Sequence, residues 1–87
     1  MATRQSIDDC LLHCEEAIDF AESQYKEASL QEHNNAEEFA SAQQELEKAF
    51  LELEKILNYA TEEQEDLLQR KRIQIQTMQN KMTLLKH

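Results

Sequence analysis

The 87-residue sequence contains no glycine and no proline. Tight turns, β-bulges and phosphate-binding loops usually draw on these residues, and average usage would place about ten of them in a chain of this length. The residue types that dominate instead are Glu, Gln, Leu, Ala and Lys, all of which favour the α-helix. The composition therefore predicts an all-α protein.

The sequence also lacks segments that direct a protein to a membrane. No apolar run approaches the roughly 18 residues needed to span a bilayer, and no charged and then apolar leader opens the chain. The two cysteines, Cys10 and Cys14, lie four residues apart in one helical stretch, where they are poorly placed for a mutual disulfide. We expect a soluble, reduced, cytoplasmic protein that does not bind membranes.

Acidic residues are missing from the last part of the chain. All eighteen lie between Asp8 and Asp66, whereas five of the nine Lys and Arg residues follow Asp66. The first 66 residues, with eighteen acids and four bases, carry a net charge of −14, and the last 21 carry +5. The overall charge of −9 disfavours nucleic acid and anionic lipid as partners. The opposite charges of the two parts predict that the basic segment folds back onto the acidic remainder.

Three amphipathic segments, about 6–30, 36–58 and 62–86, show the apolar spacing of α-helices. The stripe of the first segment is Ile7, Leu11, Cys14, Ile18, Ala21, Tyr25 and Ala28. The stripe of the second segment is Phe39, Ala42, Leu46, Ala49, Leu53, Ile56 and Ala60. The stripe of the third segment is Leu68, Lys71, Ile75, Met78, Met82 and Leu85. The stripe of the second segment is a wide, core-facing one, more than a two-stranded seam would need.

Polar residues indicate where the three helices begin. Ser6, followed by Asp9 three positions later, resembles a capping box for the first helix. Asn34 or Asn35 can cap the second helix. Thr61 can cap the third, because acids that suit the positive end of a helix dipole follow it directly.

The three segments have matched lengths of about 35 Å and short connections. This pattern predicts an antiparallel up-down-up three-helix bundle, formed as a single domain by residues 1–87. One alternative stays open, because the heptad series 11, 18, 25, 32, 39, 46, 53 and 60 continues unbroken from the first segment into the second. A single helix over 6–60, with Glu32 and Asn35 in its seam, would form a long helical hairpin or an antiparallel coiled-coil oligomer with another chain.

Cys10, His13 and Cys14 form a C-x-x-H-C pattern within about one turn of the first helix. Thiolates and an imidazole can ligate zinc or copper, so these three residues are the candidate metal site. A structural zinc site requires four ligands, and no second cysteine pair is present. The competing interpretation places Cys14 in the core, Cys10 beside the core and His13 at the surface, with no metal bound.

Arg70, Lys71 and Arg72 form a basic cluster that can contact a phosphate backbone. The acidic remainder of the chain opposes that role and favours pairing of these cations with the protein's own carboxylates. The acidic surface lacks the Asp/Asn ladder and glycine of a calcium-binding EF-hand loop. No catalytic constellation or nucleophile motif is visible. We therefore expect no enzymatic activity, no cofactor and no nucleic-acid partner.

Four apolar residues lie off the main stripes and are candidates for a docking patch: Leu12, Phe20, Leu30 and Leu84. We expect Phe20 to lie outside the core. The leading hypothesis is a non-enzymatic protein–protein interaction or regulatory module, which binds an unidentified protein or its own copy through a helical face. The alternative is a structural coiled-coil oligomer. A third hypothesis is a metal- or redox-responsive helical protein that uses Cys10, His13 and Cys14.

Three stretches of the sequence resemble a family of short proteins from Bacillus-type bacteria, the YtzC-like domain of unknown function. They are MATRQSIDD at the start, QEHNNAEEFASAQQELE around the first connection and RKRIQIQTMQNKMTLLKH at the end. The resemblance covers essentially the whole chain. It implies a bacterial cytoplasmic origin, and it brings no activity, cofactor or catalytic residue to any position.

Overall fold

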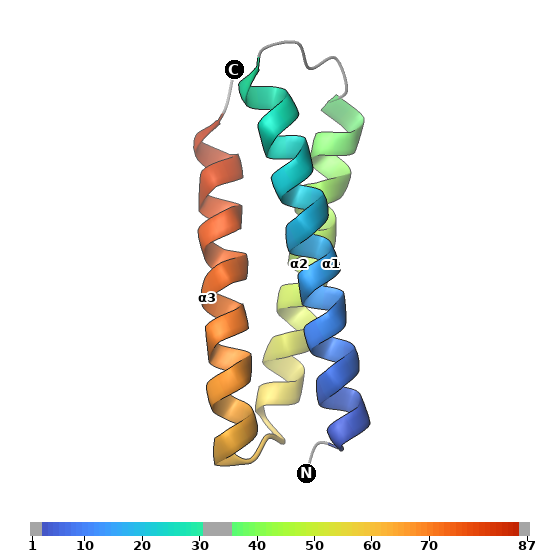
Figure 1. Cartoon of the computed structure of the whole chain (residues 1–87), viewed down its shortest axis with the longest axis vertical. Helices are drawn as coiled ribbons and strands as arrows, with labels where there is room; N and C mark the ends of the chain where they lie inside the picture. Colours follow the sequence, from blue (N-terminus) through green and yellow to red (C-terminus); the bar gives the residue numbers. More distant parts are fainter. Residues whose placement is uncertain (1–2, 31–35, 86–87) are drawn as a thin grey trace.

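The structure is a computed structural model that describes residues 3–30 and 36–85. Over these residues the chain forms three α-helices: α1 (Arg4–Ser29), α2 (Ala36–Leu57) and α3 (Glu62–Leu84). Figure 1 shows that α1 and α3 run in the same direction and that α2, which lies between them in the sequence, runs in the opposite direction. The bundle is elongated, with principal extents of 45 × 18 × 14 Å. The predicted antiparallel up-down-up three-helix bundle is confirmed.

The starts of α1 and α3 show how local sequence sets a helix boundary. Thr61 begins α3 with a reciprocal capping box, as predicted: the Gln64 amide donates to Thr61 Oγ1 at 3.3 Å, and the Thr61 amide donates to Gln64 Oε1 at 3.0 Å. The prediction that Ser6 caps α1 is wrong. Thr3 is the N-cap, because its hydroxyl accepts a hydrogen bond from the Ser6 amide at 3.0 Å and satisfies an otherwise unpaired donor of the first turn.

The ends of α1 and α2 lie at the two connections of the bundle. Leu30 ends α1 in the right-handed region of backbone space, with φ −81° and ψ −3°, and its amide donates to the Lys26 carbonyl at 3.3 Å.

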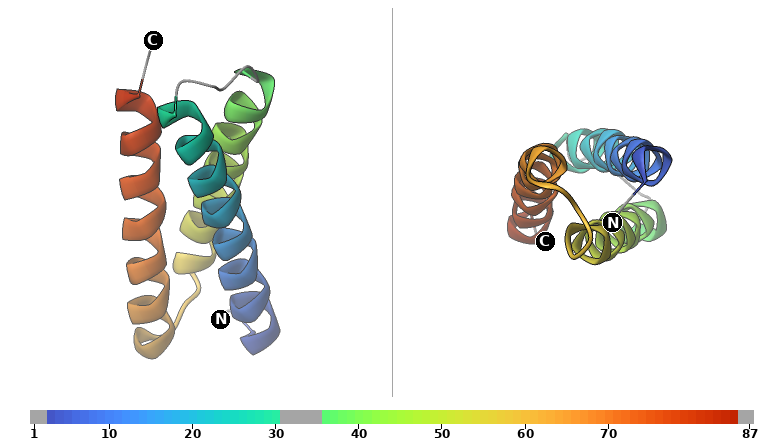
Figure 2. Two further views of the ribbon diagram at one scale, coloured as in Figure 1. Left: turned by 45° about the horizontal axis from the view of Figure 1, so that its top comes forward. Right: turned by 90° about the horizontal axis from the view of Figure 1, so that it is seen from below.

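The predicted caps of the second helix, Asn34 and Asn35, lie outside the described residues. Glu32, which was predicted to lie with Asn35 in the seam of a single helix over 6–60, also lies outside the described residues. The structure nevertheless excludes a single helix over 6–60, because α1 and α2 lie side by side in opposite directions (Figures 1 and 2).

All three helices pack around one core, and viewed along the bundle they occupy the corners of a triangle (Figure 2). The side chains that line this core differ in size between helices. The buried residues of α1 are mostly small, and they are Ile7, Cys10, Cys14, Ala17, Ala21, Gln24 and Ala28. The buried residues of α2 are Ala42, Leu46, Ala49 and Leu53. The buried residues of α3 are all large, and they are Leu68, Ile75, Met78 and Met82.

The basic residues of α3 contact both acidic helices of the same chain. Lys71 Nζ lies 3.5 Å from Glu15 Oε1 on α1, and Arg72 Nη2 lies 3.4 Å from Glu54 Oε1 on α2. The Arg72 guanidinium also lies 5.6 Å from the centroid of the Phe50 ring. Such partly exposed pairs contribute about 0–1 kcal/mol each, less than the roughly 1.5–3 kcal/mol from burying one large apolar side chain. Apolar burial therefore holds α3 in place, and the charges select the faces on which it packs.

None of the described helices combines the length and the apolar character that crossing a membrane would require.

Candidate functional site

The cysteine pair of the C-x-x-H-C pattern lies inside the bundle. The side chains of Cys10 and Cys14 are both fully buried, and the Cys14 thiol donates to the Ala49 carbonyl oxygen across the α1/α2 seam, with a sulfur–oxygen distance of 3.9 Å. The prediction that Cys10 only flanks the core is wrong. In this bundle α1 is covered by two neighbouring helices, so its buried face is wider than one stripe and takes in position 10.

A hydrogen bond between the two thiols couples their ionisation. This bond lowers the pKa of Cys14, and the same bond, together with burial, raises the pKa of Cys10. Loss of a proton from one thiol therefore opposes loss of a proton from the other. Both thiols are free in the structure. Burial also separates them from solvent, which limits the access of a metal ion or an oxidant to either sulfur.

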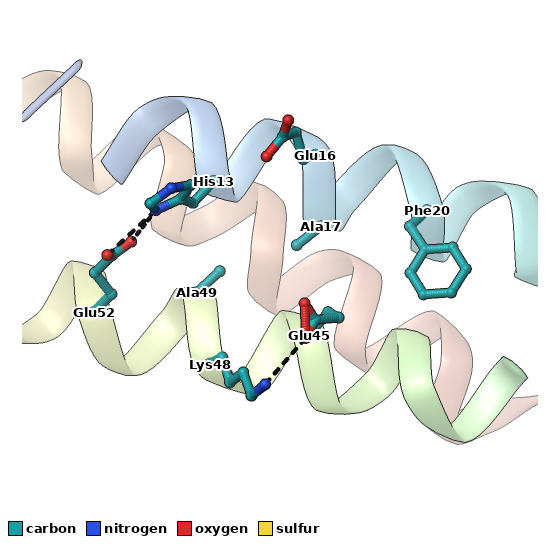
Figure 3. Close-up of a pocket in the computed structure, with 8 residues that line it drawn as sticks. All are labelled: His13, Glu16, Ala17, Phe20, Glu45, Lys48, Ala49 and Glu52. Carbon is teal, nitrogen blue, oxygen red and sulfur yellow. Dashed lines mark hydrogen bonds and ion pairs between the residues drawn. The ribbon is translucent and has the colours of Figure 1, made fainter. Parts of the chain in front are cut away.

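His13 points toward α2. Its ring Nδ1 lies 3.0 Å from Glu52 Oε1 and 3.3 Å from Glu52 Oε2 (Figure 3). The hydrogen bond and the negative charge of Glu52 raise the pKa of His13. As predicted, His13 is exposed. The three candidate metal ligands are thus not brought together, and within residues 3–30 and 36–85 no group of three or more His, Cys, Asp or Glu side chains is placed to hold a metal ion.

The His13–Glu52 pair closes one end of a groove between α1 and α2. The groove has a volume of about 450 Å³, and the described residues that line it all come from these two helices, on the side of the hairpin away from α3 (Figure 3). Ala17 from α1 and Ala49 from α2 face each other across its floor, and the half-buried Phe20 ring lies toward its other end. We call this feature the α1/α2 groove. Its apolar floor and aromatic wall are suited to an apolar side chain.

Charged residues line the two edges of the α1/α2 groove. Glu16 stands on the α1 side, and Glu45 and Lys48 stand on the α2 side, where Lys48 Nζ lies 3.4 Å from Glu45 Oε2. The side chains of Lys48 and Glu45 are 78% and 48% exposed, so this ion pair contributes little and either group can exchange partners. With His13 neutral, the groove is lined by three carboxylates and one ammonium group, and it carries a net negative charge.

A smaller depression lies between α1 and α3, with a volume of about 340 Å³. Its α1 side carries Glu15, Asp19 and Glu22, and its α3 side includes the exposed Ile73 and Lys81. We call this feature the α1/α3 depression. It resembles the α1/α2 groove in its acidic α1 edge and in the single lysine, Lys81, on its other side.

The four predicted docking residues occupy different environments. Leu12, Leu30 and Leu84 are 55%, 68% and 84% exposed, so they are free to meet a partner. Phe20 departs from the prediction, because it is only partly exposed and packs against the core. Leu12 and Leu30 are 18 residues apart on α1, which separates them by about 27 Å. The four residues therefore do not form one patch, and their role in binding stays a prediction.

The residues of the α1/α2 groove follow a second helical spacing on each of α1 and α2, which the main apolar stripes do not reveal. His13, Ala17 and Phe20 follow the spacing i, i+4, i+7, which defines a second face of α1. Glu45, Ala49 and Glu52 repeat the same spacing on α2. Only the antiparallel packing of the two helices brings these faces together, so neither series identifies the groove by itself.

Comparison with known proteins gives a family and one relative. A family model described as "Protein of unknown function (DUF2524)" matches residues 1–84, which include all three helices. The chain is 46% identical over 84 residues to "Uncharacterized protein YtzC" of Bacillus subtilis (strain 168), a match that covers 97% of this chain and 93% of the relative. No solved structure matches the chain. The resemblance to the YtzC-like family is thereby confirmed.

Proposed function

We propose that this chain, which belongs to the DUF2524 family, is a non-enzymatic interaction module that binds another protein through a helix-lined face. The α1/α2 groove carries the proposal. It offers an apolar floor at Ala17 and Ala49, an aromatic wall at Phe20 and charged edges. An apolar centre with a charged rim is the usual layout of a protein-binding surface.

The chemistry of the groove favours binding over catalysis. Among the described residues, its lining consists of alanine, phenylalanine, carboxylate, lysine and histidine side chains, with no hydroxyl or thiol that could act as a nucleophile beside His13. The two thiols of α1 are fully buried, and the Cys14 thiol contacts the Ala49 carbonyl across the α1/α2 seam. The imidazole of His13 is already engaged by Glu52. These groups are better suited to orienting a partner than to transforming a substrate.

We propose the bacterial cytoplasm as the compartment in which the module acts. Two free thiols support a reducing environment, and the similar protein YtzC comes from a Bacillus species. A surface rich in carboxylates also supports a protein partner over nucleic acid, because it repels phosphate groups.

The experiment is affinity capture of binding proteins from bacterial cytosol on the immobilised full chain, followed by quantitative mass spectrometry. Each enriched protein is then purified and titrated against the chain by calorimetry. The expected result is saturable binding of at least one protein with defined stoichiometry. Recovery of only those proteins that also bind a bare-resin control would overturn the proposal.

Light scattering after size-exclusion chromatography tests the alternative, a structural coiled-coil oligomer. A mass near the 10.2 kDa of one chain supports the module. A mass of two or more chains that persists on dilution supports the oligomer instead.

A further inference from the structure

The α1/α2 hairpin already binds one cationic amphipathic helix, namely α3. On that face, Lys71 reaches Glu15 of α1 and Arg72 reaches Glu54 of α2. Between these charges, α3 buries an apolar face that consists of Leu68, Ile75, Met78 and Met82. The chain itself thus shows that two acidic antiparallel helices can hold a third helix by apolar burial, with cations on its flanks paired to both of them.

The opposite face of the same hairpin repeats the arrangement without a helix on it. Ala17 and Ala49 provide the apolar centre, while Glu16 on α1 and Glu45 on α2 provide carboxylates on the two flanks (Figure 3). Glu15 and Glu16 are adjacent in the sequence, yet Glu15 pairs with α3 and Glu16 lines the groove. α1 therefore presents an acidic edge toward each side of the hairpin.

From this repetition we infer that the α1/α2 groove binds a cationic amphipathic α-helix of a partner protein, packed along the hairpin on the side away from α3. This inference rests on the proposed interaction function and specifies its site and its ligand class. The small floor residues leave room for a Leu, Met or Phe side chain of the partner, with the Phe20 ring beside it. Arg or Lys residues on the flanks of the partner helix pair with Glu16 and Glu45.

Charge and geometry favour another protein over a second copy of this chain. Each copy carries a net charge of −9, so two copies repel each other. The cations of α3 are also engaged within the chain: Lys71 and Arg72 pair with the other helices, and Arg70 Nη2 lies 3.1 Å from Asp66 Oδ2. The free face of α3 points away from the groove of the same molecule. If α3 of one copy bound in the groove of a second copy, the contact would therefore repeat and give an open-ended chain of molecules.

The test uses the full chain and a designed fluorescent peptide of about 20 residues, with leucines along one helical face and arginines on both flanks. A control peptide carries glutamate in place of each arginine. The groove variant is Glu16→Lys with Glu45→Lys, and its matched control is Asp19→Lys with Glu22→Lys in the α1/α3 depression. Both double variants change the net charge equally, so a difference between them reports position. Circular dichroism melting establishes that each variant is folded.

The arginine peptide is expected to bind the wild-type chain saturably and the glutamate peptide is not. The groove variant should weaken binding by about tenfold or more, and the matched control by no more than about twofold. Raising the salt concentration from about 50 mM to about 500 mM should also weaken the binding of the arginine peptide to the wild-type chain. If the groove variant does not fold, Glu16→Gln with Glu45→Gln replaces it, with an expected loss of about threefold.

Three results would overturn the inference. The first is equal binding of the two peptides, and the second is an equal loss in both double variants, which would indicate general attraction to an acidic surface. The third is a stable oligomer of the chain that dissociates in the groove variant, which would make a second copy the occupant. The proposed function is tested separately: a captured protein that still binds the groove variant removes the site assignment and leaves the interaction module intact.

Discussion

The α1/α2 seam and the two seams of α3 are built in different ways. The Cys14 thiol meets the Ala49 carbonyl across the first seam, where α1 contributes mostly small buried side chains and α2 contributes Ala42 and Ala49. The α3 seams are filled by the large side chains of α3 and flanked by ion pairs. Side-chain size at a contact sets how closely two helix axes approach. The helices of the first seam can therefore approach closely, whereas the other two seams are filled by the large side chains of α3.

Because of this difference, we expect opposite kinds of substitution to destabilise the two regions. The small side chains of a tight seam can hardly be shortened, whereas a larger side chain at such a position would overpack the seam and destabilise the fold. A seam filled by Leu, Ile and Met loses both transfer free energy and packing when a side chain is shortened. Substitutions that add volume to the α1/α2 seam, or remove volume from a seam of α3, therefore distinguish the two kinds of packing.

The largest expected effect comes from shortening a fully buried residue of α3. Ile75→Ala should lower the free energy of unfolding by about 2–5 kcal/mol, because it removes buried apolar volume and leaves a cavity. Ile75→Val, the matched control, should cost about 0.5–1.5 kcal/mol. Urea unfolding followed by circular dichroism measures both values. Equal losses for the two variants would show that the seam repacks around the missing atoms.

The next effect comes from enlarging a residue of the tight seam. Ala21 is fully buried, so Ala21→Leu should lower the free energy of unfolding by about 1–3 kcal/mol through overpacking. Ala40→Leu, at an exposed position of α2, should change it by no more than about 0.5 kcal/mol. The same urea titrations measure both. A stabilising effect of Ala21→Leu would mean that the α1/α2 seam contains unfilled space.

A smaller effect is expected from the charges that flank α3. A double-mutant cycle with Arg72→Met and Glu54→Gln should give a coupling of about 0.5–1 kcal/mol, because both side chains are partly shielded, at 32% and 40% exposure. The cycle for Arg70 and Asp66, which are 73% and 65% exposed, should give a coupling near zero. A larger coupling for the Arg70 pair would contradict the view that shielding decides the strength of these contacts.

The smallest effect is the pH dependence of the His13–Glu52 pair. The folded pKa of His13 lies above its unfolded value of about 6.5. The pair therefore stabilises the fold fully below about pH 6.5, and this stabilisation is lost as the pH rises through the folded pKa of His13. The melting temperature of the wild type should exceed that of His13→Gln near pH 6, and the difference should shrink toward pH 9. Glu52→Gln should remove the same pH-dependent part, and a difference that does not vary with pH would refute the assignment.

Much of the fold could be predicted because its determinants are local. The lack of glycine and proline, the apolar spacing and the Thr61 cap together located three helices and the start of α3. The N-cap of α1 was misplaced by three residues, since Thr3 and Ser6 both carry a hydroxyl and only the folded backbone decides which one is the cap. The reversal between α1 and α2 was undecided because their heptads share one phase. It follows from contacts across the seam, which a periodic pattern does not contain.

The candidate site was less predictable because it depends on two helices at once. The exposure of His13 followed from its position off the main stripe. Cys10 and Phe20 were placed wrongly because a helix with two neighbours buries a face wider than one stripe. The α1/α2 groove requires in addition the relative register of the hairpin, which sets Ala17 opposite Ala49 and His13 opposite Glu52. No spacing within a single helix specifies that register.

The up-down-up order also has a mechanical consequence. α1 begins at one pole of the molecule and α3 ends at the other, about the full length of the bundle away (Figure 1). Tension applied between Arg4 and Leu84 would therefore act along the helix axes and slide the helices past one another. Sliding loads the contacts of a seam together, whereas tension on two neighbouring ends peels them apart one after another. Optical-tweezer measurements with handles on α1 and α3 would thus report the shear strength of the whole core.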